Sequence, residues 1–225
     1  QHQWTDACDT RQRLSKLTDG EPKNESILAF LENEIGLEAM RRKDYPEAIR
    51  RFEAAIDLDA RAVPAYLNLG DVRVAQGRDQ EAVDIWERLV RVAPDRAYLA
   101  FDRLEEVAVR TSAPERFTKL CRHLIDGTPQ DWRARLALSR HLAAGGHPAG
   151  SEAALELLFA ALVQNPHALG IHQAIWRALG QLHHPTALVD DGEDEGAETP
   201  RSGAEAEHVI GEVRAALQPY WRSLG

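Results

Sequence analysis

The sequence predicts an all-α fold built from repeated helix hairpins, because residues of the same type recur about every 34 positions. A glycine, an alanine and an aromatic residue each recur after one period, and prolines close successive units: the pairs are Gly36 and Gly70, Ala48 and Ala82, and Phe52 and Trp86, and the prolines are Pro94, Pro129 and Pro166. This is the pattern of the tetratricopeptide repeat (TPR). One hairpin cannot bury its apolar face alone, so we expect a right-handed superhelical TPR solenoid of stacked antiparallel hairpins.

The repeat pattern divides the chain into four parts. They are the second helix of a preceding truncated repeat with its turn (1–24), a TPR array of about four full repeats plus a following helix (25–188), an acidic mobile loop (189–203), and a C-terminal helix and tail (204–225). In the first part, Trp4, Ala7, Leu14 and Leu17 share one face of a predicted helix, and residues 18–23 form a turn.

The first two full repeats, about 25–60 and 63–94, follow the pattern well. Gly36 lies where the two helices of its hairpin must approach closely, and Gly70 is its equivalent in the next repeat. Pro46 suits the first turn of the second helix, where the missing N–H group costs no hydrogen bond.

The later repeats depart from the pattern. The third, about 97–129, has Leu104 where the glycine is expected, and the fourth, about 131–166, has a three-residue insertion in a turn predicted over 145–151. The first helix of a fifth repeat is predicted over about 168–183. The carboxylates of 190–195 lie within about a Debye length of 8 Å of one another and repel, which predicts the mobile loop. A last helix is predicted over 204–218.

Composition argues against several classes of function. The formal charge of −9 is the wrong sign for a main surface that binds nucleic acid. Apolar runs fall short of the roughly 18 residues of a membrane span. Cys8 and Cys121 form neither a disulfide framework nor a Cys-x-x-Cys metal clip, which favours a reducing compartment. The sequence starts at Gln1 without a methionine, so we interpret it as a fragment or processed form.

No combination of side chains predicts a catalytic, metal or cofactor site. No nucleophile is accompanied by a base and an orienting group, and the Gly145-Gly146 turn lacks the Lys-Ser/Thr ending of a phosphate loop. Four histidines lack the spacing of a helical metal-ligand pair and are interpreted as structural or surface residues: His167, His172, His183 and His184.

Several residues that could suggest a ligand site are expected in the core instead. Cys121 falls on the buried side of its helix and suits a small apolar role. The same interpretation applies to four tryptophans: Trp4, Trp86, Trp132 and Trp176. Trp221, near the end of the chain, either packs or once packed on a further module.

The inner, concave face of the predicted solenoid is the candidate binding site for another protein or peptide. It is lined by the first helix of each repeat, at these positions: Phe30, Asn33, Leu37, Met40, Leu67, Asp71, Val74, Tyr98, Phe101, Glu105, Arg133, Leu136, Arg140, Gln173 and Arg177. The stripe is apolar at one end and basic at the other, which favours a groove for a helix or an extended peptide. The alternative is an ordinary solvated helix face.

Three segments resemble a narrower family. They are Arg116-Phe117-Thr118-Lys119-Leu120-Cys121-Arg122, the run 133–138 with Leu142 and Gly145, and Leu162-Val163-Gln164-Asn165-Pro166-His167 with Ile171-His172. Together with the final Pro219-Tyr220-Trp221-Arg222, they resemble the C-terminal TPR half of the lipopolysaccharide assembly protein B (LapB/YciM) family.

The resemblance implies a bacterial adaptor on the cytoplasmic face of the inner membrane. Family members have an N-terminal anchor, a TPR body and a C-terminal rubredoxin-type knuckle, and they link an LpxC-like deacetylase to an FtsH-like membrane protease. This sequence contains neither the anchor nor the cysteine pairs of the knuckle. Iron or zinc binding is therefore not carried over to this chain and is expected only where a parent protein has the knuckle.

Three classes of function stay open at this point. The first is the adaptor. The second is a structural TPR subunit of another envelope, secretion or pilus assembly, which the repeats alone do not exclude. The third is an enzyme, which the sequence disfavours because it shows no acid–base pair or cofactor fingerprint. The sequence does not name the partner or the oligomeric state.

Overall fold

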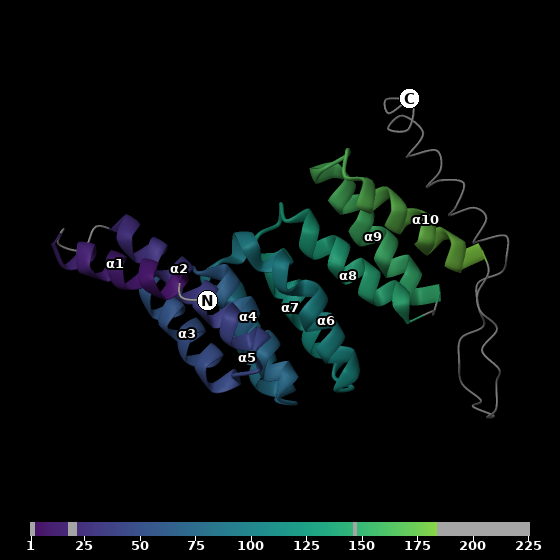
Figure 1. The fold of residues 1–225 in the computed structure, drawn as a ribbon. Helices are drawn as coiled ribbons and strands as arrows, with labels where there is room; N and C mark the ends of the chain where they lie inside the picture. The colour runs from purple at the N-terminus through teal and green to yellow at the C-terminus, as the bar shows by residue number, and fades with distance from the viewer. Residues whose placement is uncertain (1–2, 18–21, 146–147, 184–225) are drawn as a thin grey trace. The chain divides into compact units, whose positions relative to one another are not determined.

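The structure is a computed structural model that describes residues 3–17, 22–145 and 148–183 (Figure 1). These residues form ten α-helices and one 3-10 helix, and no strand occurs among them: α1 (Gln3–Leu17), α2 (Pro22–Arg41), α3 (Tyr45–Leu58), α4 (Val63–Ala75), α5 (Asp79–Val92), η1 (Pro94–Ala100), α6 (Phe101–Arg110), α7 (Pro114–Gly127), α8 (Trp132–Ala144), α9 (Pro148–Gln164) and α10 (Leu169–His183). The all-α TPR fold class is confirmed. The chain divides into two compact units, residues 1–116 and 117–225, and each is described by itself.

Unit 1 contains the two hairpins predicted from the best repeats. Helices α2 and α3 form the first hairpin and α4 and α5 the second, as Figure 1 shows. Helix α1 packs on α2 through Cys8, Leu28, Leu31 and Ile35. Helix α2 begins at Pro22, so the last two residues of the turn predicted over 18–23 are helical instead. Proline is well suited to the first turn of a helix because it has no N–H group to leave unpaired.

Two glycines allow the helices of each hairpin in unit 1 to approach. A Cβ atom on Gly36 would lie 2.6 Å from Cε1 of Phe52, and one on Gly70 would lie closer still to the indole nitrogen of Trp86. Phe52 and Trp86 are both fully buried. The predicted close approach of the two helices at Gly36 is confirmed.

The turn between the helices of each hairpin has the same backbone form three times. Lys43, Gly77 and Ser112 all adopt positive φ, at 61°, 73° and 55°. In each turn the next residue donates its N–H to a carbonyl five positions earlier; for Gly77 this bond runs from Arg78 to Arg73 at 2.9 Å. This is the hydrogen-bond pattern with which helices commonly end at a left-handed residue.

The third repeat begins differently from the first two. Residues 94–100 form the 3-10 helix η1, and the α-helix starts only at Phe101. Leu104, which replaces the repeat glycine, is buried with Phe101, Val107 and Ala108 along one side of α6. A 3-10 helix turns faster per residue than an α-helix, so the positions before Phe101 do not follow the register expected from the repeat.

Unit 2 is held together by an apolar core between α9 and α10, against which the side chains of Trp132 and Leu136 from α8 also pack. The core residues are Leu155, Leu158, Ala161, Leu162, Ile171, Ala174, Ile175, Ala178 and Leu179. Trp176 is 53% exposed, so its predicted core position was wrong. The neighbouring Ile175 lies on the buried side of α10, and one residue further along turns the indole outward.

The turn between α8 and α9 is shorter than the predicted span of 145–151, because α9 already begins at Pro148. A Cβ atom on Gly150 would lie 2.6 Å from the carbonyl oxygen of Leu142, so this glycine permits α9 to approach the α8 backbone. Ser151 is fully buried, and its hydroxyl bonds to Oε1 of Gln181 at 3.1 Å. The predicted acidic loop, the helix over 204–218, His184 and Trp221 lie outside the described residues.

Candidate functional site

The predicted binding residues of unit 1 come from α2, α4, η1 and α6, and we call the surface that they form the helix A face. Phe30 and Tyr98 are its most exposed aromatic side chains, at 54% and 37%. The others that are partly accessible are Leu37, Met40, Leu67, Asp71, Val74 and Glu105. The rings of Phe30 and of Trp4 on α1 meet in a T-shaped contact, with 6.1 Å between their centroids. The face therefore offers apolar and aromatic groups of the kind that hold peptides.

Two of the predicted residues belong to the interior. Phe101 is 4% exposed, because the 3-10 segment before it alters the register. Asn33 is 5% exposed and bridges successive repeats: its Oδ1 accepts a hydrogen bond from Nδ2 of Asn68 at 2.8 Å. A buried amide needs such partners, so Asn33 orders the face and offers little surface to a ligand.

A groove of about 260 Å³ lies in the helix A face between α4 and α6. Its lining consists of Asp71, Val74, Ala75, Trp86, Arg103, Glu106 and Val107. Asp71 and Arg103 meet in a two-pronged ion pair, with Nε–Oδ1 and Nη2–Oδ2 distances of 2.8 and 2.9 Å. This pair raises the pKa of Arg103, chiefly through the hydrogen bonds to Asp71. The groove thus combines an apolar wall at Val74 and Val107 with a fixed, charged rim.

The predicted residues of unit 2 lie on α8 and α10. Arg133, Arg140, Gln173 and Arg177 are exposed. The guanidinium of Arg133 sits over the ring of Trp132, 4.8 Å from its centroid, which orients the charge at the start of α8. Leu136 packs against the unit 2 core and contributes less surface. This part of the candidate site is mainly basic.

The sequence reasoning missed three polar residues that shape the site: Asn68, Arg103 and Glu106. The signal was present for Arg103, since an acid and a base about one repeat apart occupy neighbouring first helices. Asp71 and Arg103 are such a pair. Asn68 could have been found in the same way, because it and Asn33 are two amides about one period apart.

The histidines serve packing and surface roles where the structure describes them. His172 is 7% exposed, and its Nε2 lies 2.7 Å from the carbonyl oxygen of Pro166, which ties α10 to the preceding turn. His167 is exposed. Across the described ranges, no three or more His, Cys, Asp or Glu side chains come together in a way that could hold a metal ion.

The stacked hairpins and their glycine–aromatic contacts are those of the TPR fold. Residues 39–101 match the family model for the tetratricopeptide repeat. They cover the second helix of the first hairpin, the whole second hairpin and the start of the third repeat. None of the curated proteins matches the sequence. No helix in the described part of the chain is long and apolar enough to cross a membrane.

Several solved structures are similar in fold. A MamA protein is 14% identical with a TM-score of 0.47, covering 86% of this chain and 94% of its own. MamA from Desulfovibrio magneticus RS-1, residues 41 to the end, is 17% identical with a TM-score of 0.44, covering 84% and 96%. YrrB, described as a TPR protein with an unusual peptide-binding site, is 19% identical with a TM-score of 0.37, covering 74% and 98%.

Proposed function

We propose that this chain is a non-enzymatic scaffold that holds a segment of another protein on its helix A face. The observation that supports this most is the groove beside Asp71 and Val74 in a face that also carries the exposed aromatic side chains of Phe30 and Tyr98. Aromatic and apolar groups supply contact area, and the fixed Asp71–Arg103 pair supplies orientation. The face is held in place by buried hairpins, so little ordering is needed when a peptide binds.

The partner proposed is an LpxC-like deacetylase, presented to an FtsH-like membrane protease, so that the parent protein regulates lipopolysaccharide synthesis at the inner membrane. The support is the resemblance carried by residues 116–122, 133–138 and 162–172. Most of the apolar residues in these segments, such as Phe117, Cys121 and Leu138, are buried. They specify how unit 2 packs, and partner choice must then come from the exposed residues around them.

Capture from a lipopolysaccharide-making bacterium tests both levels of the proposal. The bait is the membrane-tethered parent protein, as wild type and as Val74→Glu, which places a charge in the apolar wall of the groove. We expect the wild type to recover the deacetylase or the protease and the variant to lose about tenfold or more of it, with an unchanged melting temperature. Val163→Glu is the matched control, since Val163 is 72% exposed and lies on α9, a helix that carries none of the predicted face residues.

The outcomes separate the general proposal from the specific one. If wild type and Val74→Glu recover the same proteins in the same amounts, the helix A face of unit 1 is not the binding surface. If Val74→Glu loses partners that are components of a secretion or pilus assembly, the scaffold proposal holds and the adaptor role fails.

In unit 2, Arg140→Glu together with Arg177→Glu should weaken capture of an acidic partner and leave the melting temperature nearly unchanged.

A further inference from the structure

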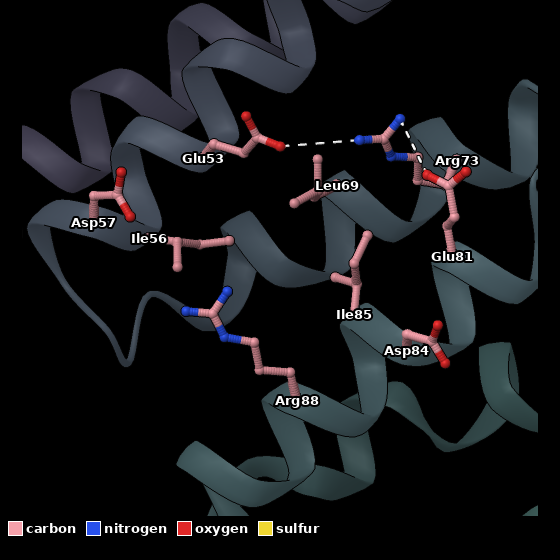
Figure 2. A pocket seen from close by; sticks show the side chains of 9 residues that line it. All are labelled: Glu53, Ile56, Asp57, Leu69, Arg73, Glu81, Asp84, Ile85 and Arg88. Carbon is pink, nitrogen blue, oxygen red and sulfur yellow. Dashed lines mark ion pairs between the residues drawn. The ribbon is translucent and has the colours of Figure 1, made fainter.

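Unit 1 has a second groove on the other side of α4, between the second helices of its two hairpins. Figure 2 shows the nine side chains that line it. Its apolar floor consists of Ile56, Leu69 and Ile85. The charged residues of the lining come from three helices: Glu53 and Asp57 from α3, Arg73 from α4, and Glu81, Asp84 and Arg88 from α5. On α4, Leu69 and Asp71 are two residues apart, and this places them on nearly opposite sides of the helix. The groove is therefore separate from the helix A face.

The carboxylates that line this groove differ in how far they are already paired. Asp84 pairs with Arg116 at 2.8 Å and Glu81 with Arg78 at 3.5 Å, so Glu53 and Asp57 on α3 are the acids most available to a ligand. Arg73 is held loosely: its Nη1 lies 3.3 Å from Glu81 and its Nη2 lies 3.9 Å from Glu53. Its Nε atom is buried and has no hydrogen-bond partner. Arg88 also lines the groove, where its guanidinium points toward Ile56 and Asp57 (Figure 2) and lies over the ring of Tyr66, 5.5 Å from the centroid.

The size and shape of the groove indicate what kind of ligand it fits. Its volume is about 280 Å³, slightly below the roughly 300–1,000 Å³ of sites that enclose a small molecule. It lies open along two helices, as Figure 2 shows. The lining residues on α5 recur at helical spacing, and along the groove they present two acids, one apolar residue and one arginine: Glu81, Asp84, Ile85 and Arg88. Such a channel accepts one or two side chains from a polypeptide laid across it.

We propose that this groove docks a basic, amphipathic segment of a partner protein, with an aliphatic side chain on the Ile56–Leu69–Ile85 floor and a lysine or arginine beside Glu53 and Asp57 of α3. The long stem of lysine or arginine can cover apolar surface while its charged head stays near water, and this matches an apolar floor beneath carboxylates. The loosely held Arg73 can shift toward one of its two carboxylates and leave the other to the incoming cation. The chain would then hold one polypeptide on each side of α4.

Peptide titration followed by methyl NMR of the whole chain tests this inference. The probe is a short peptide with capped ends, in which leucines lie on one face of a helix and arginines lie beside them. The counterpart peptide has glutamate in place of each arginine. We expect the arginine peptide to shift the methyl signals of Ile56, Leu69 and Ile85, while those of Val74 and Val163 stay unchanged. The affinity should fall as salt is added, because screening weakens exposed ion pairs.

Asp57→Lys is the informative variant, because Asp57 is exposed on the rim of the groove. It should weaken the arginine peptide about tenfold, and Glu156→Lys on α9, which also replaces an exposed acid, should leave binding unchanged. The inference is overturned if the glutamate peptide shifts the same three methyl groups equally, if the arginine peptide shifts only Val74, or if Asp57→Lys binds as tightly as wild type. The three groove methyl groups and the Asp57 variant report on this groove, whereas Val74 reports on the helix A face, so the two proposals fail independently.

Discussion

At the scale of single residues, the distance between the helices of a hairpin in unit 1 is set by the absence of one carbon atom. Gly36 faces the ring of Phe52, and Gly70 faces the indole of Trp86, whose Nε1 also donates a hydrogen bond to the carbonyl of Leu67 at 3.3 Å. Both aromatic side chains are fully buried and cannot move aside into solvent. The close contact thus fixes the groove walls, because Trp86 also lines the helix A groove.

Gly70→Ala is therefore expected to destabilise unit 1. Alanine favours helix by about 1 kcal/mol over glycine, but forcing a methyl group against a packed indole costs about 1–3 kcal/mol or more. The net effect should be a lower midpoint of urea unfolding. Gly180→Ala on α10 is the control, since a Cβ atom there meets nothing within 4 Å, and it should raise stability. A Gly70→Ala protein as stable as wild type would show that the helices can separate freely.

The Cys8 thiol provides a pH-dependent term in stability. It is 2% exposed and donates a hydrogen bond to Oε1 of Glu32 at 3.3 Å, while Nη1 of Arg51 holds the other carboxylate oxygen at 2.9 Å. Burial, followed by the hydrogen bond to Glu32, raises the pKa of Cys8 from 9.0 to about 11. The folded state thus favours the protonated thiol more than the unfolded state does.

The stabilisation from this thiol is complete below pH 9 and is lost as the pH rises from about 9 to 11. It amounts to about 3 kcal/mol, since each pKa unit corresponds to about 1.4 kcal/mol. We expect the difference in unfolding free energy between wild type and Cys8→Ala to shrink by this amount across that window. In addition, iodoacetamide at pH 8 should modify Cys8 far more slowly than a free cysteine. A constant difference between the two proteins would contradict the assignment.

At the scale of elements, the turns between helices carry strain at two of three equivalent positions. Lys43 and Ser112 adopt the left-handed conformation that Gly77 adopts without cost. The hydrogen bonds are the same in all three turns, so the backbone form is imposed by the hairpin rather than by the residue. Side chains of L-residues are disfavoured there by roughly 1 kcal/mol.

Replacing either strained residue by glycine should therefore stabilise the protein. We expect Lys43→Gly and Ser112→Gly each to gain about 0.5–1 kcal/mol, after the greater freedom of glycine in the unfolded chain is included. Gly77→Ala should lose about 1 kcal/mol. Urea unfolding of the three variants measures these values. A loss of stability in Lys43→Gly would mean that its side chain contributes more than the turn costs.

The elements that follow the repeat were predictable, and those that depart from it were not. Gly36, Ala48 and Phe52 identify a hairpin because each residue type is required at one position by packing. The start of the third repeat at η1 carries no such signal, since Leu104 replaces the glycine and both helix types suit the local sequence. Phe101 was therefore placed on the surface, although it is buried. Burial at such positions depends on contacts that the periodicity does not contain.

At the scale of unit 1 as a whole, the irregular third repeat is joined to the second by arginine–carboxylate pairs. Three arginines contribute: Arg103 pairs with Asp71, Arg110 with Asp79, and Arg116 with Asp84 and Glu87, all with shortest distances of 2.6–2.8 Å. Arg103 and Arg110 each contact both oxygens of one carboxylate. Because a repeat array is stabilised by nearest-neighbour interfaces, these pairs act where the repeat motif is weakest.

Replacing Arg103, Arg110 and Arg116 by alanine should loosen α6 without unfolding the first two hairpins. Partly exposed ion pairs contribute about 0.2–1 kcal/mol each, so together their loss should speed amide hydrogen exchange in α6 by about tenfold or more. Exchange in α2–α5 should change little, because the glycine–aromatic contacts there are untouched. Arg61→Ala is the control: its pair with Asp95 is more than half exposed on both sides, and exchange in α6 should stay as in wild type. Equal acceleration in α2–α5 would instead show that unit 1 opens as one cooperative body. In that case the helix A groove could not loosen at α6 while the acidic groove between α3 and α5 stays formed.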